Sequence, residues 1–374
     1  MQAPDGPAGG APATCYNTRM TNDDRPPDCP GDCQPPKLPL RLPPDLLRLS
    51  FEKLRPSAQG LAAWQGGLRA KLAELLALDL AALAAWPPAW QVLQRREMDG
   101  YSLSLISFQS LEGLTVPAYL LLPRTPGPWP GVLIAHGHDL GARSAAGVIE
   151  SNDGQEGLGM RLARGGLAVL APDLLSFGQR QVGPLPDPVG RRAHEVFANF
   201  AMEVGRPIAG LHLMDLMQAQ AILAAWPGVD AGRLGVAGLS QGGRLACLLA
   251  ALETGLRACL VASGLTSSLL VDRGNQHLHD AVPGLLAWAD YPDLAGLVAP
   301  RALMLSWGLR EPFPYCVETR DLVTHNYLRP IWELAGAPEN LELDLHPRGH
   351  CYNPAAALDF FARHLMAGRT AAME

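Results

Sequence analysis

Lysine is almost missing from this sequence of 374 residues, which contains only Lys37, Lys53 and Lys71. The other basic residues are arginines, and no lysine follows position 71. The bulk of the chain therefore cannot supply the lysine of a Walker A phosphate loop, a Schiff base or a Ser–Lys catalytic pair. The glycine fingerprints GxGxxG and GxxxxGK[ST] are missing too, which argues against a nucleotide- or NAD-binding protein.

Charge is also scarce, because only 18% of the residues are charged and the net charge is −6. Basic residues gather in nothing longer than pairs such as Arg95-Arg96 and Arg191-Arg192, so we expect no nucleic-acid partner. No run of 18 apolar residues occurs, and no basic segment followed by an apolar one opens the chain. We therefore expect no membrane association and a cytoplasmic location. A hydrophobic content of 48% provides for a large core and excludes global disorder.

The seven cysteines are odd in number and irregular in spacing. Cys29 and Cys33 could suggest a zinc site or a disulfide, but no second pair lies near them in the sequence. The last four cysteines are typical of the reduced thiols of a cytosolic protein: Cys247, Cys259, Cys316 and Cys351. We expect neither a metal nor a cofactor.

Composition and periodicity divide the chain into three parts. Residues 1–44 hold 11 of the 34 prolines and are predicted to form a disordered tail. Residues 45–95 are predicted to be a helical segment that packs on the main domain, because apolar residues recur on one helical face: Trp64, Leu68, Leu72, Leu75 and Leu76. Residues 96–374 are predicted to be that main domain.

Strand and helix patterns alternate through the main domain. Short apolar or alternating runs predict strands at residues 101–108, 116–122, 131–135, 167–170, 234–237, 258–262, 302–306 and 341–345. Helical patterns cover residues 211–225, 242–252, 322–334 and 355–365. This order predicts the α/β class, with a mostly parallel central sheet covered by helices on both faces.

The strongest motif is Gly238-Leu239-Ser240-Gln241-Gly242, which follows an apolar strand and opens a helix. This is the context of a nucleophile elbow, in which flanking glycines permit a sharp turn and expose the serine above the strand end. We predict that Ser240 is a catalytic nucleophile.

A second motif, His136-Gly137-His138-Asp139, follows an earlier apolar strand. Acyl transfer needs two N–H donors directed at the developing oxyanion. We expect one from the backbone of Gln241 and the other from the backbone of His138, where Gly137 permits close approach. A metal site at the two histidine side chains is not expected, since Leu140-Gly141 follow instead of a further Asp-His.

The general base should lie between the last strand and the last helix, where only His346 and His350 occur. His350 stands in a turn beyond the strand, whereas His346 stands at the strand terminus, so we favour His350. Pro347 excludes a helical zinc pair at these two positions.

The acid should follow the preceding strand, giving the chain order Ser, acid, His. Glu311 is the first carboxylate beyond residues 302–306, and it would fix the tautomer of His350. Three rival carboxylates stay open: Asp290, Asp293 and Asp321.

With these motifs in this order, residues 45–367 resemble the α/β-hydrolase superfamily. The closest resemblance is to its dienelactone-hydrolase and acetyl-xylan-esterase-like bacterial esterases. Supporting segments are Ala171-Pro172-Asp173, Phe177-Gly178-Gln179-Arg180, Gly205-Arg206-Pro207, Pro283-Gly284-Leu285 and Ala299-Pro300-Arg301. The resemblance implies an α/β-hydrolase fold. This branch usually has Asp where Glu311 stands, and the dienelactone hydrolases proper use a cysteine where Ser240 stands.

These observations predict a serine hydrolase that cleaves small-molecule carboxylic esters, with acetyl-type esters foremost. Two alternatives share the fold, a prolyl-oligopeptidase-like exopeptidase or amidase and a catalytically inactive binding protein. Two stretches are plausible substrate linings, Phe177–Phe200 and Ser263–Asp293, and both could equally be structural cover. The second contains Gln276, His277, His279, Trp288 and Tyr291.

Overall fold

The computed structural model describes residues 58–111, 113–181, 191–268, 281–311 and 322–366. The chain divides into two units, Met1–Pro43 and Pro44–Glu374, and the description below concerns the second. The predicted disordered tail at residues 1–44 lies outside the described residues.

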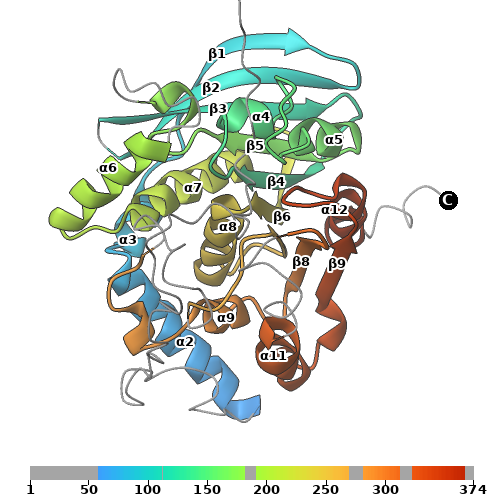
Figure 1. Ribbon diagram of the computed structural model, residues 1–374. Coiled ribbons are helices and arrows are strands. Elements are labelled where there is room, and N and C mark those ends of the chain that lie inside the picture. Colours follow the sequence, from blue (N-terminus) through green and yellow to red (C-terminus); the bar gives the residue numbers. More distant parts are fainter. Residues whose placement is uncertain (1–57, 112, 182–190, 269–280, 312–321, 367–374) are drawn as a thin grey trace, which may run out of the picture. The chain divides into compact units, whose positions relative to one another are not determined.

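Nine strands of the described residues form one sheet, in the order β1-β2-β3-β5-β4-β6-β7-β8-β9 (Figure 1). Neighbours from β5 to β9 are parallel, and β1, β2, β3 and β5 pair antiparallel. The bounds are β1 Trp90–Glu97, β2 Tyr101–Leu111, β3 Leu114–Pro123, β4 Trp129–Ala135, β5 Ala168–Pro172, β6 Val229–Leu239, β7 Ala258–Ala262, β8 Ala302–Gly308 and β9 Leu341–His346. The predicted mostly parallel sheet is therefore confirmed.

The central strands are continuous apolar runs because both of their faces are covered. Every residue of β5, β7 and β8 is buried. Strand β1 differs: all of its residues except Trp90 are exposed, and it pairs with β2 at the edge of the sheet. Its sequence has no apolar alternation, and residues 90–95 were predicted to belong to the helical segment instead.

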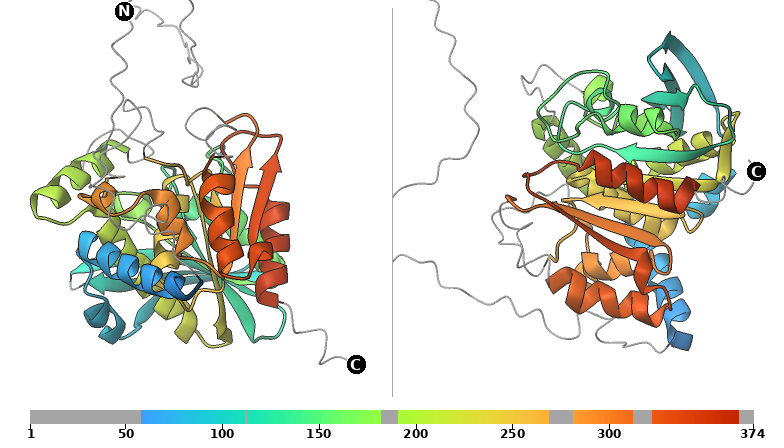
Figure 2. Two further views of the ribbon diagram at one scale, coloured as in Figure 1. Left: turned by 90° about the horizontal axis from the view of Figure 1, so that it is seen from below. Right: turned by 90° about the vertical axis from the view of Figure 1, so that its right-hand side faces the viewer.

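Helices lie on both faces of the sheet, as the two views of Figure 2 show. They are α2 Ala58–Leu75, α3 Leu80–Ala85, α4 Ala142–Ala145, α5 Leu158–Arg164, α6 Arg191–Glu203, α7 Ile208–Ala225, α8 Gln241–Leu252, α9 Tyr291–Gly296, α11 Arg329–Leu334 and α12 Pro354–Phe361. One-turn 3₁₀ segments occur at Gly178–Arg180, Leu285–Ala287 and Pro338–Asn340, and π-helical segments at Leu322–Leu328 and Ala362–Met366.

Two hydrophobic clusters fill the space between these helices and the sheet. One contains apolar side chains of α2, α7, α8, α9 and α11, and the other those of α5 and α12. In α2 the predicted apolar face is buried at Trp64, Leu68, Leu72 and Leu76. The division into a helical segment at 45–95 and a catalytic domain at 96–374 stays a prediction.

Helix α7 is the one described helix that is long and apolar enough to cross a membrane. However, 72% of its apolar window is buried inside the protein. It contacts β2, β4, β5 and β6 on one face of the sheet, as a core helix does.

Candidate active site

Ser240 stands between β6 and α8 in a backbone conformation that non-glycine residues rarely adopt, with φ 60° and ψ −123°. Such strain costs on the order of 1–3 kcal/mol and persists only where the surroundings enforce it. Neighbouring glycines make the turn possible. A Cβ on Gly238 would lie 1.9 Å from the Gly242 carbonyl oxygen, and one on Gly242 would lie 2.1 Å from the Ala135 carbonyl oxygen. The geometry is that of the predicted nucleophile elbow.

His350 and Glu311 are brought together beyond the carboxyl ends of β8 and β9. His350 Nδ1 lies 3.0 Å from Glu311 Oε2, and the Glu311 side chain is fully buried. The other oxygen, Oε1, accepts hydrogen bonds from the Ser263 hydroxyl and from the Gly308 N–H, the latter at 3.0 Å. Two groups thus hold one oxygen of the Glu311 carboxylate, and the other oxygen faces the histidine.

The rival carboxylates that the structure describes, Asp290 and Asp293, cap a helix. Asp290 caps α9 by accepting from the Tyr291 N–H at 2.8 Å, and Asp293 completes the capping box by accepting from the Asp290 N–H at 2.8 Å. Asp321 lies outside the described residues. His346 is buried at the end of β9, and burial lowers its pKa. The pairing of His350 with Glu311 therefore agrees with the roles predicted for them, which themselves stay predictions.

The loop at Gly154 packs between His350 and the elbow. The Gly154 carbonyl accepts from the Tyr352 N–H at 3.0 Å. A Cβ on Gly154 would lie 2.4 Å from the His350 carbonyl oxygen and 3.1 Å from Leu239 Cδ2. Since Leu239 precedes Ser240, the backbone of His350 lies close to the elbow.

The His136–Asp139 segment also lies against the elbow. A Cβ on Gly137 would be 2.9 Å from the Leu239 carbonyl oxygen and 3.3 Å from Ser240 Cβ. The Asp139 carboxylate holds the segment by accepting from the N–H groups of Gly137 and Gly141, at 3.0 and 2.8 Å, and from the Gln155 amide. Gly137 therefore lies close to Ser240, and the role predicted for the backbone N–H of the next residue, His138, stays a prediction.

Both ring nitrogens of His136 contact backbone groups. Nδ1 lies 2.8 Å from the Gly137 carbonyl, and Nε2 accepts from the Leu174 N–H at 3.0 Å. Among the residues that the structure describes, no group of three His, Cys, Asp or Glu side chains could hold a metal ion.

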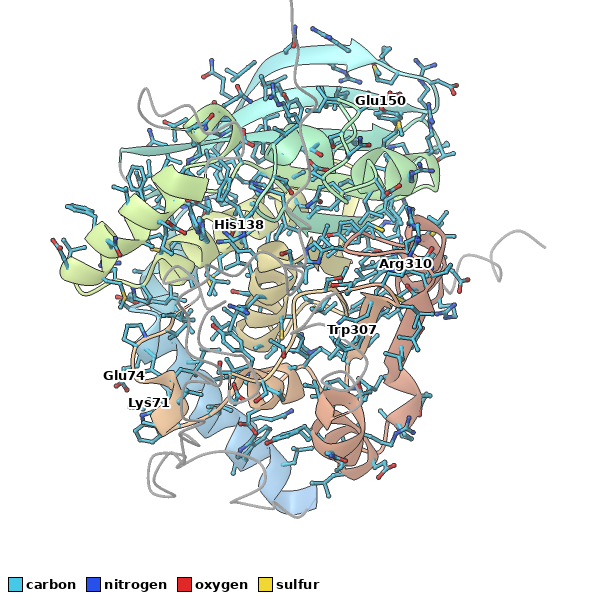
Figure 3. The ribbon with its side chains drawn as sticks, in the orientation of Figure 1. Lys71, Glu74, His138, Glu150, Trp307 and Arg310 are labelled. Carbon is cyan, nitrogen blue, oxygen red and sulfur yellow. The ribbon has the colours of Figure 1, made fainter. Side chains whose placement is uncertain are left out.

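A cluster of aromatic and histidine rings lies beside His138 and Gln241. The Phe177 ring lies 4.9 Å from His194 and 5.7 Å from His138, and His194 stacks on His212 at 5.2 Å. Phe177 follows Asp173, whose carboxylate accepts from the N–H groups of Ala142 and Gln179 and whose pKa is raised by burial. In Figure 3, His138 lies beside the start of α8, whereas Lys71 and Glu74 lie apart from it on α2.

The contacts of several residues of the site were not predicted. Ser263 and His194 fall within the two stretches named as plausible linings, but no motif marks them, and only the structure shows their contacts with Glu311 and Gln241. Asp139 stands inside the quoted motif, but its role in the loop needed the structure. Of the predicted linings, Gln276, His277 and His279 lie outside the described residues. Trp288 lies beneath the Lys71 amine at 4.4 Å, and Tyr291 beneath Arg244 at 4.6 Å.

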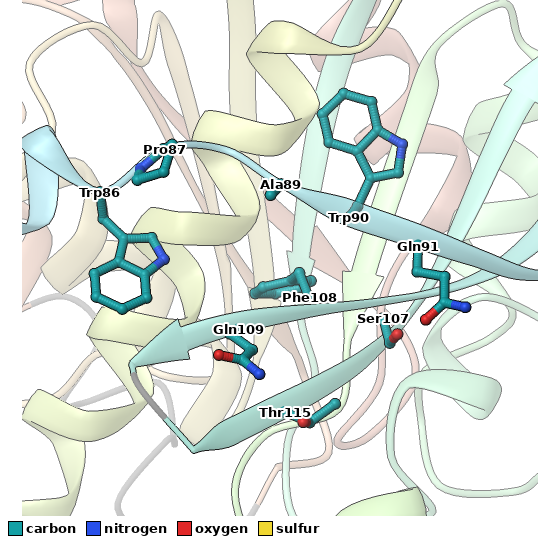
Figure 4. Close-up of a pocket in the computed structure, with 9 residues that line it drawn as sticks. All are labelled: Trp86, Pro87, Ala89, Trp90, Gln91, Ser107, Phe108, Gln109 and Thr115. Atoms are coloured by element: carbon teal, nitrogen blue, oxygen red, sulfur yellow. The ribbon is translucent and has the colours of Figure 1, made fainter.

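A groove of about 620 Å³ lies elsewhere, along the first strands of the sheet (Figure 4). It contains none of the predicted site residues and is lined by Trp86, Pro87, Ala89, Trp90, Gln91, Ser107, Phe108, Gln109 and Thr115. The Trp90 ring packs on Trp226 at 4.7 Å, so this tryptophan also belongs to the core packing.

Comparison with known proteins finds one family profile, one curated relative and many solved structures of similar fold. Residues 116–282 match the sequence profile of the Dienelactone hydrolase family. YtaP of Bacillus subtilis (strain 168), named as a hydrolase, is 29% identical over 195 residues, which are 50% of this chain. The match spans 62% of that relative's length.

Solved structures share the fold at low sequence identity. BF1801 of Bacteroides fragilis NCTC 9343, named as an acetyl xylan esterase, superposes with a TM-score of 0.67 at 19% identity, covering 80% of this chain and 78% of the other. The methylesterase BT1017 superposes with a TM-score of 0.65 at 23% sequence identity, covering 84% of this chain and 66% of the other. A glucuronoyl esterase from Teredinibacter turnerae T7901 superposes with a TM-score of 0.58 at 16% sequence identity, covering 86% of this chain and 89% of the other. The chain therefore has the α/β-hydrolase fold and matches the profile of the Dienelactone hydrolase family over residues 116–282.

Proposed function

We propose that the protein is a serine esterase that cleaves small carboxylic esters, acetyl-type esters foremost, through an acyl-enzyme on Ser240. The observation that carries this proposal is the 3.0 Å contact between His350 Nδ1 and the buried carboxylate of Glu311. It lies at the same edge of the sheet as the strained serine, in the chain order serine, acid, histidine that the fold uses.

In the first half of the reaction, Ser240 Oγ attacks the ester carbonyl carbon. Glu311 engages Nδ1 of His350, so Nε2 takes the serine proton. The carbonyl oxygen becomes an oxyanion held by the backbone N–H groups of His138 and Gln241. The tetrahedral intermediate then collapses, the bond to the alcohol oxygen breaks, and Nε2 returns its proton to the leaving alcohol.

The second half repeats these steps with water. His350 takes a proton from the water, whose oxygen attacks the acyl-enzyme carbonyl, and the same two N–H groups hold the second oxyanion. Collapse releases the carboxylic acid and restores the Ser240 hydroxyl. Throughout, the Glu311 carboxylate stabilises the imidazolium without taking its proton.

The names of the structural neighbours suggest the kind of ester. By their printed names they are acetyl xylan esterases, a methylesterase and a glucuronoyl esterase. An oxygen ester with a small acyl or alcohol part is therefore the first substrate class to test. The small-molecule ester is the partner that this proposal requires.

The direct test is a fluorophosphonate probe, which labels an activated serine, applied to the full-length protein and to Ser240→Ala. Hydrolysis of p-nitrophenyl acetate, butyrate and octanoate is measured in parallel, and Ser107→Ala on β2 is the matched control. We expect labelling and acetate hydrolysis in the wild type and in Ser107→Ala, with both lost in Ser240→Ala.

Two other outcomes would change the conclusion. Labelling of Ser240 without hydrolysis of any ester would favour the exopeptidase or amidase alternative. No labelling of a folded protein would favour the inactive binding protein.

We also infer a cytoplasmic location. Three of the cysteines that the structure describes, Cys247, Cys259 and Cys351, carry free thiols, which is common in a reducing compartment. Fractionation of the producing cells tests this inference, since recovery of the protein outside the cytoplasm would contradict it.

A further inference from the structure

His194 on α6 touches both residues that would supply the oxyanion hole, although it lies 47 positions from one of them in the sequence. Its side chain is fully buried. Nε2 lies 2.7 Å from the Gln241 amide nitrogen, and the ring packs edge-on against the His138 ring at 5.5 Å. The proposed mechanism gives this residue no role.

The partners of His194 determine which of its nitrogens carries the proton. The Gln241 Nε2 group can only donate, so His194 Nε2 accepts from it. The proton then resides on Nδ1, which donates to the Ser176 hydroxyl at 3.0 Å. Ser176 is itself fully buried, with a φ of 73°. A chain of two hydrogen bonds thus runs from the buried Ser176 to Gln241, the residue after Ser240.

That residue needs such an anchor. Gln241 is the first residue of α8, and it follows the strained Ser240, whose side chain makes no capping hydrogen bond. Strained backbone relaxes unless neighbouring contacts enforce it. Relaxation here would rotate the peptide between Ser240 and Gln241, which carries the N–H that faces the oxyanion. The buried amide of Gln241, held by His194, opposes this rotation.

We propose that His194 is a positioning residue of the oxyanion hole, which holds Gln241 by a hydrogen bond and His138 by ring packing. This inference rests on the proposed function. His194 acts on the transition state, in which the oxyanion exists, more than on the bound ester. Its loss should therefore appear in kcat and leave KM almost unchanged.

Three variants separate the hydrogen bond from the packing. His194→Phe keeps an aromatic ring beside Phe177 and His138 but cannot accept a hydrogen bond. His194→Gln offers a carbonyl oxygen as acceptor, and His364→Phe on the far side of the sheet is the control. With p-nitrophenyl acetate we expect His194→Phe to lower kcat about 10- to 100-fold, with KM within about twofold. His194→Gln should recover most of this loss, and His364→Phe should match the wild type.

A double-mutant cycle tests the path through Gln241. Gln241→Leu retains the backbone N–H and loses the side-chain amide. If His194 acts by holding this amide, the double variant His194→Phe/Gln241→Leu should lose about as much kcat as either single variant. Rates of fluorophosphonate labelling should follow the same order, because the phosphonyl oxygen enters the same oxyanion hole.

The inference is overturned by wild-type kcat in His194→Phe, by losses that add in the double variant, or by a loss confined to KM. If His194→Phe does not fold, Ser176→Ala takes its place, because it removes the partner of Nδ1 and should lower kcat in the same direction. Failure of the proposed function looks different: the wild type itself would then neither hydrolyse esters nor label at Ser240.

Discussion

The Glu311 carboxylate is held through one oxygen and faces a histidine with the other. One oxygen is held by Ser263 and Gly308, and the other faces His350 Nδ1 at 3.0 Å. Asp293 contributes to a helix cap instead. Replacing each carboxylate therefore tests a catalytic role against a structural one.

Glu311→Ala should lower kcat for p-nitrophenyl acetate by about 10²–10⁴-fold, because His350 loses the group that fixes its tautomer and stabilises its charge. Asp293→Ala should leave kcat within about twofold and cost about 1 kcal/mol of stability through the lost cap. Steady-state kinetics and urea unfolding measure both. A silent Glu311→Ala beside an inactive Asp293→Ala would reverse our assignment of the acid.

Part of this site could be predicted from the sequence, and part could not. Ser240, His350 and the His136–Asp139 loop stand in local motifs whose spacing already limits their geometry. The contacts of Glu311 with Ser263 and of Gln241 with His194 span 48 and 47 positions. No local pattern marks such pairs, because they arise only when separate strand ends meet at one edge of the sheet.

At the scale of elements, burial decides what a sequence pattern reveals. The buried strands β5, β7 and β8 are short apolar runs and were predicted within a few residues. Strand β1 forms through pairing with β2, and its sequence WQVLQRRE faces solvent almost throughout. Its strand character lies in backbone hydrogen bonds to a neighbour, which hydrophobic periodicity cannot detect.

The elbow depends on the close approach of α8 to the end of β4. A Cβ at Gly242 would lie 2.1 Å from the Ala135 carbonyl oxygen and 2.5 Å from that of His136, both backbone atoms. Gly242→Ala should therefore destabilise the protein by about 3 kcal/mol or more and abolish activity. Differential unfolding in urea gives the stability change.

Gly66→Ala is the matched control for that substitution. Gly66 is exposed within α2, and a Cβ there would meet no atom within 4 Å. Since alanine forms helices better than glycine, this variant should gain about 0.5–1 kcal/mol in the free energy of unfolding and keep full activity. A Gly242→Ala variant as stable and active as Gly66→Ala would disprove the proposed packing of the elbow.

A buried ion pair ties the loop after β5 to α7. Arg180 Nη1 lies 2.5 Å from Asp215 Oδ2, both side chains are nearly inaccessible, and the Ser110 hydroxyl donates to the same carboxylate. Burial raises the pKa of Asp215, whereas Arg180 lowers it. Removing only the arginine would leave a buried carboxylate without its counter-charge.

Arg180→Met should therefore lower the free energy of unfolding by about 3–5 kcal/mol at pH 7. The double variant Arg180→Met/Asp215→Leu should lower it by less than that single variant. The defect of Arg180→Met should shrink as the pH falls, because protonation removes the uncompensated charge of Asp215. Urea unfolding at pH 5 and pH 7 measures both effects. A double variant less stable than Arg180→Met would show that the pair contributes more than charge compensation.

At the scale of the whole molecule, both faces of the sheet bury acidic groups in their neutral form. Cys247 and Cys259 lie in the cluster beneath α8, and Tyr352 lies in the cluster beneath α12. Burial raises the pKa of the Cys247 thiol from 9.0 to about 12 and holds those of Cys259 and Tyr352 well above their usual values. Ionisation of any of them thus opposes folding on one face or the other.

The sign of the resulting pH dependence follows from proton binding. Between pH 9 and 12 the unfolded chain releases the Cys247 proton while the folded chain keeps it, so stability falls as the pH rises. This difference in the pKa of the Cys247 thiol between the unfolded and folded chain corresponds to about 4 kcal/mol of folding free energy. Below pH 9 the contribution is fully present and constant. The protein should therefore unfold cooperatively in mild alkali.

Cys247→Ala tests this account through the slope of stability against pH, because the cavity that it creates costs the same at every pH. Urea unfolding from pH 8 to pH 11, with a reducing agent throughout, should give a shallower loss for Cys247→Ala than for the wild type. Tyr352→Phe should flatten the curve further, at the highest pH values. Parallel curves for the three proteins would mean that other groups, outside the two buried clusters, govern unfolding in alkali.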